Sequence, residues 1–164
     1  MARIENRLDA LAAGRAAAGD WTVPGSHELL GNLQRRGLTL YLASGTDLPF
    51  VRREAELLGL TEFFGRHIYG ALDDYQNFSK KMVIERLLEE NNLSGEELLG
   101  FGDGFVEIEE VRRVGGVAVA VASDEANRRG VNAWKRERLI RAGADIVIGD
   151  YRAQQDLLNF LLGT

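Results

Sequence analysis

Five short apolar runs, separated by stretches with helical patterning, constrain the fold of this chain more than any other feature. They comprise residues 38–43, 67–72, 98–102, 117–122 and 144–148 (LTLYLA, HIYGAL, LLGFG, VAVAVA and ADIVI). Because none shows the strict polar alternation of a strand with one exposed face, each suits a strand that is buried on both faces. Helices on both sides of a sheet provide that cover, so we predict a three-layer α/β domain with a mainly parallel sheet.

Helix signals lie between these runs. Ser26, Asp47 and Ser79 can each cap the start of a helix. Residues 152–162 are expected to form a last helix, and its packing face comprises Leu157, Leu158, Leu161 and Leu162. Residues 1–21 form an Ala-rich helical segment with a narrow apolar stripe, which we interpret as a remnant leading from a larger helical part. Residues 22–164 then form the α/β core.

The composition excludes several classes of protein. With 164 residues and 45% hydrophobic side chains, the chain can bury the core of one globular domain. The absence of Cys excludes thiolate nucleophiles and cysteine-bound metals, and two His exclude a three-histidine zinc site. A net charge of −5 argues against broad nucleic-acid binding. No apolar run approaches the roughly 20 residues of a membrane-spanning helix, and no signal peptide is evident, so we expect a cytoplasmic protein without a membrane partner.

Two polar segments could bind an anion at the carboxyl ends of the predicted strands, where α/β proteins bind their ligands. Ser44, Gly45 and Thr46 follow the first run and offer a hydroxyl and backbone amides before a helix. Lys80 and Lys81 stand at the start of the third predicted helix, where the helix dipole disfavours a cation and a nearby anion would favour it. Each segment also has an ordinary structural explanation: residues 44–46 can form a strand-to-helix turn, and the two lysines can be a solvated surface pair.

A third segment could bind a cation. Asp103 and Glu107 follow the third run, four residues apart at the opening of a helix, so their carboxylates face the same way. Such oxygen ligands suit a hard divalent ion. A capping Asp with a first-turn Glu is the simpler structural explanation.

The glycines of this region also resemble a nucleotide-binding loop. Gly100, Gly102 and Gly104 alternate along the chain. A dinucleotide fingerprint needs a third glycine where Phe105 stands, and a methyl-donor loop usually has an acid where Leu98 stands. Each pattern misses by one position, so we do not expect either ligand.

The order of the three polar segments resembles motifs two, three and four of the haloacid dehalogenase superfamily, whose members are mostly magnesium-dependent phosphohydrolases. The segments VPGSHELLGNLQRRGLTLYLASGTD and HIYGALDDYQNFSKKMVIERLL look like its phosphatase-type branch, and the resemblance covers roughly residues 22–162. It implies a Rossmann-like core and phosphatase activity on small phosphate esters.

The resemblance implies a role for each polar side chain. Ser44, with Gly45 and Thr46, would bind the transferring phosphoryl group, and Lys80, or failing that Lys81, would neutralise its charge.

The metal-binding positions of the family match two acidic residues. Asp103 and Glu107 would help to hold Mg²⁺, and the substrate would be a small phosphorylated molecule.

The first motif of the superfamily, a strand that ends in Asp-x-Asp, is absent. Its first Asp is the nucleophile that forms an aspartyl-phosphate, and its second Asp protonates the leaving group. Asp73 and Asp74 follow a predicted strand but lack the spacing and the following Gly and Thr, and no other Asp of the chain fits the motif. We therefore expect the carboxyl-terminal part of a longer hydrolase, inactive as given, whose nucleophile and central motif-one strand lie outside these residues.

An inactive family member is the alternative. In that case the domain is an interaction or regulatory module, and a partner strand, for example from a homodimer, completes its sheet.

Overall fold

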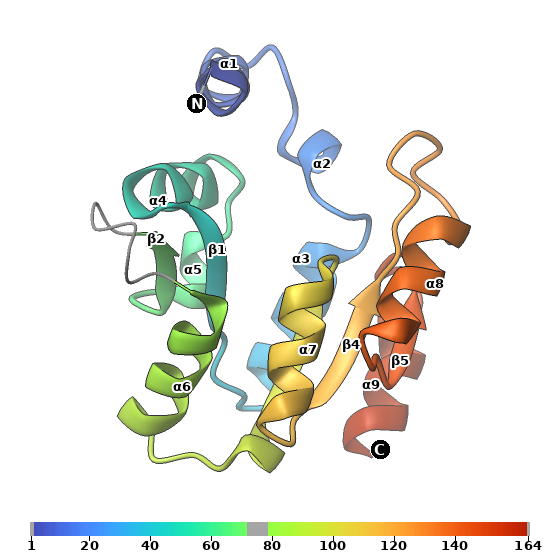
Figure 1. Cartoon of the computed structure of the whole chain (residues 1–164). Helices are drawn as coiled ribbons and strands as arrows, with labels where there is room; N and C mark the ends of the chain where they lie inside the picture. The colour runs from blue at the N-terminus through green and yellow to red at the C-terminus, as the bar shows by residue number, and fades with distance from the viewer. Residues whose placement is uncertain (1, 72–78, 164) are drawn as a thin grey trace. The chain divides into compact units, whose positions relative to one another are not determined.

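The computed structural model of the chain describes residues 2–71 and 79–163 (Figure 1). These residues belong to two compact units. Unit 1 comprises Met1–Phe78 together with Arg152–Thr164, and unit 2 comprises Ser79–Tyr151. No helix in the described ranges combines the length and the apolar character needed to cross a membrane.

Unit 1 is built on two parallel strands. Its elements are α1 (Ala2–Ala12), α2 (Ala18–Trp21), α3 (Ser26–Arg35), β1 (Leu42–Asp47), α4 (Leu48–Leu57), α5 (Thr61–Phe64), β2 (Ile68–Ala71) and α9 (Gln154–Leu162). β1 pairs with β2, and α4 packs against both strands. Val51 and Ala55 of α4 bury their side chains against Phe64 and Ile68, which forms the core of this unit.

The first and last helices of unit 1 pack on its middle elements. On α1, Leu8 and Leu11 are buried, and Arg7 forms a 2.6 Å ion pair with Glu54 of α4. The apolar stripe in residues 1–21 therefore contacts α4, and the division into a remnant and a core stays a prediction.

The carboxyl-terminal helix α9 lies against α3. The Asn32 side chain of α3 donates a 2.6 Å hydrogen bond to the Gln154 side chain, and Leu158 is fully buried. The prediction that Leu162 belongs to the packing face is wrong, because this residue is 42% exposed.

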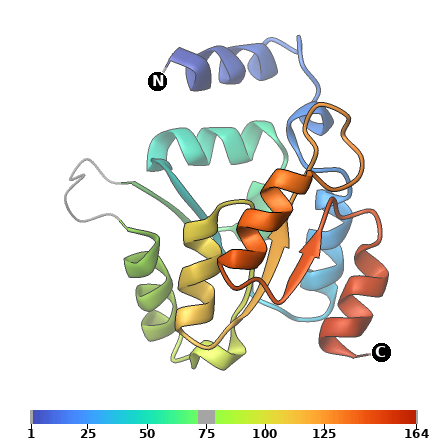
Figure 2. The same cartoon turned by 45° about the vertical axis from the view of Figure 1, so that its right-hand side comes forward.

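Unit 2 is a three-stranded parallel sheet in the order β3-β4-β5. Its elements are α6 (Lys80–Glu90), the short 3₁₀ helix η1 (Gly95–Glu97), β3 (Leu99–Gly102), α7 (Phe105–Arg113), β4 (Val117–Val121), α8 (Ala133–Arg141) and β5 (Ile146–Ile148). α7 and α8 lie on one face of the sheet (Figure 2). Ile108 and Leu139 from these helices pack on Ala118 and Ala120 of β4, all nearly inaccessible to solvent.

The ladders between β1 and β2, β3 and β4, and β4 and β5 are all parallel, which confirms the predicted α/β class. One isolated antiparallel bridge joins Ser123 to Val131 outside these strands. The first strand begins at Leu42 rather than at residue 38, because Leu40 packs on the unit 1 core without joining the ladder. The last strand begins at Ile146 rather than at residue 144. Before it, the Asp145 carboxylate accepts a 2.8 Å hydrogen bond from the Ala118 amide and a 3.1 Å bond from Arg112.

We expect Gly100→Ala to lower the free energy of unfolding by about 1–3 kcal/mol, because a new methyl group overpacks the interface between α7 and β3. A Cβ atom at Gly100 would overlap the Val111 side chain of α7. The measurement is urea-induced unfolding followed by circular dichroism.

Gly31→Ala is the matched control. Gly31 lies within α3, and its Cβ would meet only the flexible end of the Arg35 side chain, at 3.3 Å. This substitution should be neutral or stabilise the protein by up to about 1 kcal/mol. Equal effects of the two substitutions would contradict the close approach of α7 to β3.

Candidate functional site

An ion pair joins the predicted cation to a predicted carboxylate within unit 2. Lys80 is the first residue of α6, and its Nζ contacts Oε1 of Glu107 in the first turn of α7. Ser79 caps α6 as predicted, because its Oγ accepts a 3.2 Å hydrogen bond from the Met82 amide. Both charged side chains are about three-quarters buried, at 23% and 25% exposure, so water screens their attraction less than on an open surface.

Asp103 lies next to this pair, in the turn that follows β3. Its side chain is exposed, and its negative charge acts on Lys80. Partial burial lowers the pKa of Lys80, and the charge of Asp103 raises it in part. The structure thus brings Lys80, Asp103 and Glu107 together beyond the carboxyl end of β3.

Glycines on both sides of Asp103 make room for Glu107. A Cβ at Gly102 would lie 3.0 Å from the Cβ of Glu107, and a Cβ at Gly104 would overlap its carboxylate. These glycines therefore let the start of α7 approach the turn after β3. This steric requirement accounts for the glycines at these two positions, and no bound nucleotide is needed to explain them.

Tyr151 is a further residue near Asp103, and the sequence analysis did not single it out. It follows β5, and its ring lies edge-on to Phe101 of β3 with centroids 6.0 Å apart. Burial and the charge of Asp103 both raise the pKa of Tyr151, so its hydroxyl stays protonated at physiological pH. No sequence pattern pointed to it, because a single aromatic residue after a strand has no characteristic spacing.

Ser44, Gly45 and Thr46 lie in unit 1, and the prediction that they follow the strand is wrong. They lie within β1, at a point where its ladder with β2 is irregular: Ala43 pairs with Tyr69, and the next paired residue of β1 pairs with Ala71. Three residues of β1 thus oppose one residue of β2, as in a β-bulge.

A local hydrogen bond and a glycine accompany this irregularity. The Thr46 amide donates to Ser44 Oγ at 3.2 Å. A Cβ at Gly70, the opposing residue, would lie 2.7 Å from the Thr46 carbonyl oxygen, so only glycine fits there. Lys81, the alternative to Lys80, has an exposed side chain and forms no ion pair with any described residue.

Comparisons with known proteins show the family of the chain. The family model described as "Hydrolase: haloacid dehalogenase-like hydrolase" matches residues 5–115. The comparison with curated proteins found no match.

Solved structures have a similar fold. A predicted phosphatase from Clostridium acetobutylicum is 20% identical, with a TM-score of 0.67 over 86% of this chain and 60% of its own. A hydrolase of the same family from Deinococcus radiodurans, with bound phosphate and sodium, is 16% identical, with a TM-score of 0.69 over 84% of this chain and 59% of its own. A haloacid dehalogenase-like protein from Streptococcus pneumoniae is 20% identical, with a TM-score of 0.63 over 84% and 59%.

The chain therefore spans about 60% of the length of these structures. At identities of 16–20% these structures establish the fold alone. The family model, which matches residues 5–115, establishes the family. On that evidence, this chain belongs to the haloacid dehalogenase-like hydrolase family.

Proposed function

We propose that the chain is the carboxyl-terminal part of a cytoplasmic, Mg²⁺-dependent phosphohydrolase that acts on small phosphate esters through an aspartyl-phosphate. The observation that carries this proposal is the ion pair of Lys80 with Glu107, beside Asp103, at the carboxyl end of β3. In a family of hydrolases, this combination of one cation and two carboxylates suits a phosphoryl group and its metal ion.

Asp103 and Glu107 fit Mg²⁺ as part of a ligand set. Within residues 2–71 and 79–163 no three His, Asp or Glu side chains are grouped to hold a metal ion by themselves. Mg²⁺ is usually held by one or two carboxylates, substrate phosphate and water, so two oxygen-bearing side chains meet the requirement of the protein. When bound, the ion would offset the repulsion between a carboxylate nucleophile and the phosphate.

The side chains of this chain would orient the phosphoryl group and balance its charge. Lys80, held by Glu107, would contact a phosphoryl oxygen, and we propose Ser44, Gly45 and Thr46 as further ligands of the phosphoryl group. The lowered pKa of Lys80 means that it loses its proton at lower pH than a free lysine. Phosphate binding should therefore weaken as the pH rises into the alkaline range, where Lys80 loses its positive charge.

The nucleophile would come from an Asp-x-Asp segment outside these 164 residues. Its first carboxylate forms a bond to phosphorus as the ester oxygen leaves, and its second gives that oxygen a proton. Water then cleaves the aspartyl-phosphate and releases inorganic phosphate. The chain spans about 60% of the length of its structural neighbours, which leaves room for such a segment.

An interaction module is the second candidate, and the strand edges favour it. Among the described residues, β1 pairs only with β2, and β3 pairs only with β4. Each strand thus has one edge without a paired strand in the described part of the chain, and a strand from another segment or from a second copy would add there. In this case the completed protein would not hydrolyse phosphate esters.

We expect the 164-residue chain alone to release no p-nitrophenol from p-nitrophenyl phosphate with Mg²⁺, because no nucleophile is present. A longer polypeptide that carries an Asp-x-Asp strand before residue 1 should hydrolyse the ester, and removal of Mg²⁺ by a chelator should abolish the activity. A longer polypeptide that is folded and inactive towards all phosphate esters would favour the interaction module.

In the active polypeptide, Asp103→Asn and Lys80→Met should each reduce kcat at least about 100-fold. Lys80→Met removes a positive charge that would stabilise the transition state, and Asp103→Asn removes a carboxylate that would hold Mg²⁺. Lys81→Met removes the same charge from the neighbouring exposed position, and it should change kcat by less than about twofold. Equal losses for the two lysines would contradict the assignment of Lys80.

The charge coupling can be measured in the 164-residue chain. Asp103→Asn should lower the pKa of Lys80 further, because the negative charge that raises it is removed. A ¹³C NMR titration of the lysine Cε resonances would follow this change. Glu109→Gln, at an exposed position of α7, should leave the pKa unchanged, and an unchanged Lys80 pKa in Asp103→Asn would contradict the coupling.

A further inference from the structure

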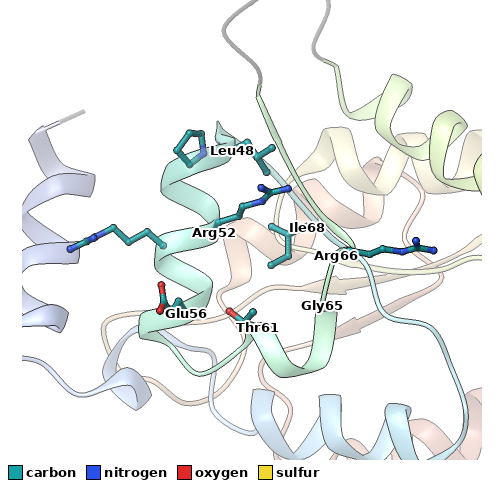
Figure 3. Close-up of a pocket in the computed structure, with 9 residues that line it drawn as sticks. Leu48, Arg52, Glu56, Thr61, Gly65, Arg66 and Ile68 are labelled. Carbon is teal, nitrogen blue, oxygen red and sulfur yellow. The ribbon is translucent and has the colours of Figure 1, made fainter.

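An open cavity of about 820 Å³ lies in unit 1, between α4 and the turn that joins α5 to β2 (Figure 3). Leu48, Arg52 and Glu56 follow each other at intervals of four along α4, so they lie on one face of that helix. Arg66, just after α5, also lines the cavity, and its side chain extends away from α4 (Figure 3). The volume is in the range of pockets that bind small organic molecules.

Positive charge is concentrated around this cavity. Arg52, Arg53 and Arg66 all line it, and Glu56 is the single acidic residue among the described lining residues. None of the three guanidinium groups forms an ion pair or hydrogen bond with a described residue. The lining thus carries three positive charges and one negative charge, whereas the whole chain has a net charge of −5.

The remaining lining offers apolar contact. Ile68 of β2 is buried, with 5% exposure, and Leu48 at the start of α4 is half-buried. A ligand here would therefore meet guanidinium groups on the helix and on the turn, and hydrocarbon between them. Guanidinium groups bind carboxylate and phosphate through paired hydrogen bonds, and an anion would also relieve their mutual repulsion.

We propose that this cavity binds a small organic anion that carries two or more carboxylate or phosphate groups. Arg52 contacts one anionic group, the exposed Arg66 side chain turns toward the cavity to contact another, and the body of the ligand lies near Leu48 and Ile68. The proposal goes beyond the phosphohydrolase function, because the cavity uses none of the residues assigned to the phosphoryl group or the metal ion.

Citrate is a suitable probe, since it has three carboxylates and no phosphoryl group to occupy the proposed hydrolase site. Isothermal titration calorimetry of the 164-residue chain should show saturable binding of citrate, without Mg²⁺ and at an ionic strength of about 20 mM, where screening is weak. Acetate at equal ionic strength should give no saturable heat, because one carboxylate cannot engage both walls.

Single substitutions in the cavity should change the affinity for citrate in opposite directions. Arg52→Gln and Arg66→Gln should each weaken citrate binding about tenfold, the loss expected for one charge-assisted contact. Glu56→Gln removes the repelling carboxylate and should strengthen binding about threefold. Circular dichroism would confirm that each variant is folded.

Arg129→Gln is the matched control. It removes the same charge from an exposed position of unit 2, and it should leave the affinity for citrate unchanged. The proposal is overturned if wild-type protein shows no saturable binding of citrate at millimolar concentration. It is also overturned if Arg129→Gln weakens binding as much as Arg52→Gln does.

Discussion

The close approach of α7 to β3 determines where the charged side chains of unit 2 lie. Gly100 leaves space for Val111, and Gly102 and Gly104 leave space for Glu107. With side chains at these glycines, α7 would have to move away from the strand, and Glu107 would no longer lie beside the turn that carries Asp103. The ion pair between Lys80 and Glu107 therefore depends on close backbone packing at these three glycines.

Much of the fold followed from patterns with a direct physical cause. Continuous apolar runs predicted parallel strands, because only strands covered on both faces contain them. Within unit 2, Lys80, Asp103 and Glu107 were predicted as site residues and lie together, since each stands at a strand or helix end. Predictions failed where tertiary contacts decide the outcome: Leu40 is apolar because it packs on the core, outside the ladder.

Other features have no signal in the sequence. The irregular pairing of β1 at Ser44 depends on the opposing Gly70, and a single strand contains no information about its partner. The arginine-lined cavity combines Arg52 with Arg66, which come from different elements and occupy ordinary surface positions in each. Only the structure shows that these two arginines line the same cavity and form no ion pair with a described residue.

The two units differ in how they are composed along the chain. Unit 2 is one continuous segment, whereas unit 1 is completed by α9, whose Gln154 bonds to Asn32 from 122 residues earlier. On a ribosome, every residue of unit 2 is available before the last helix of unit 1 has been made. Until then α3, whose Leu29 and Leu33 are buried in the finished fold, lacks the neighbouring helix α9.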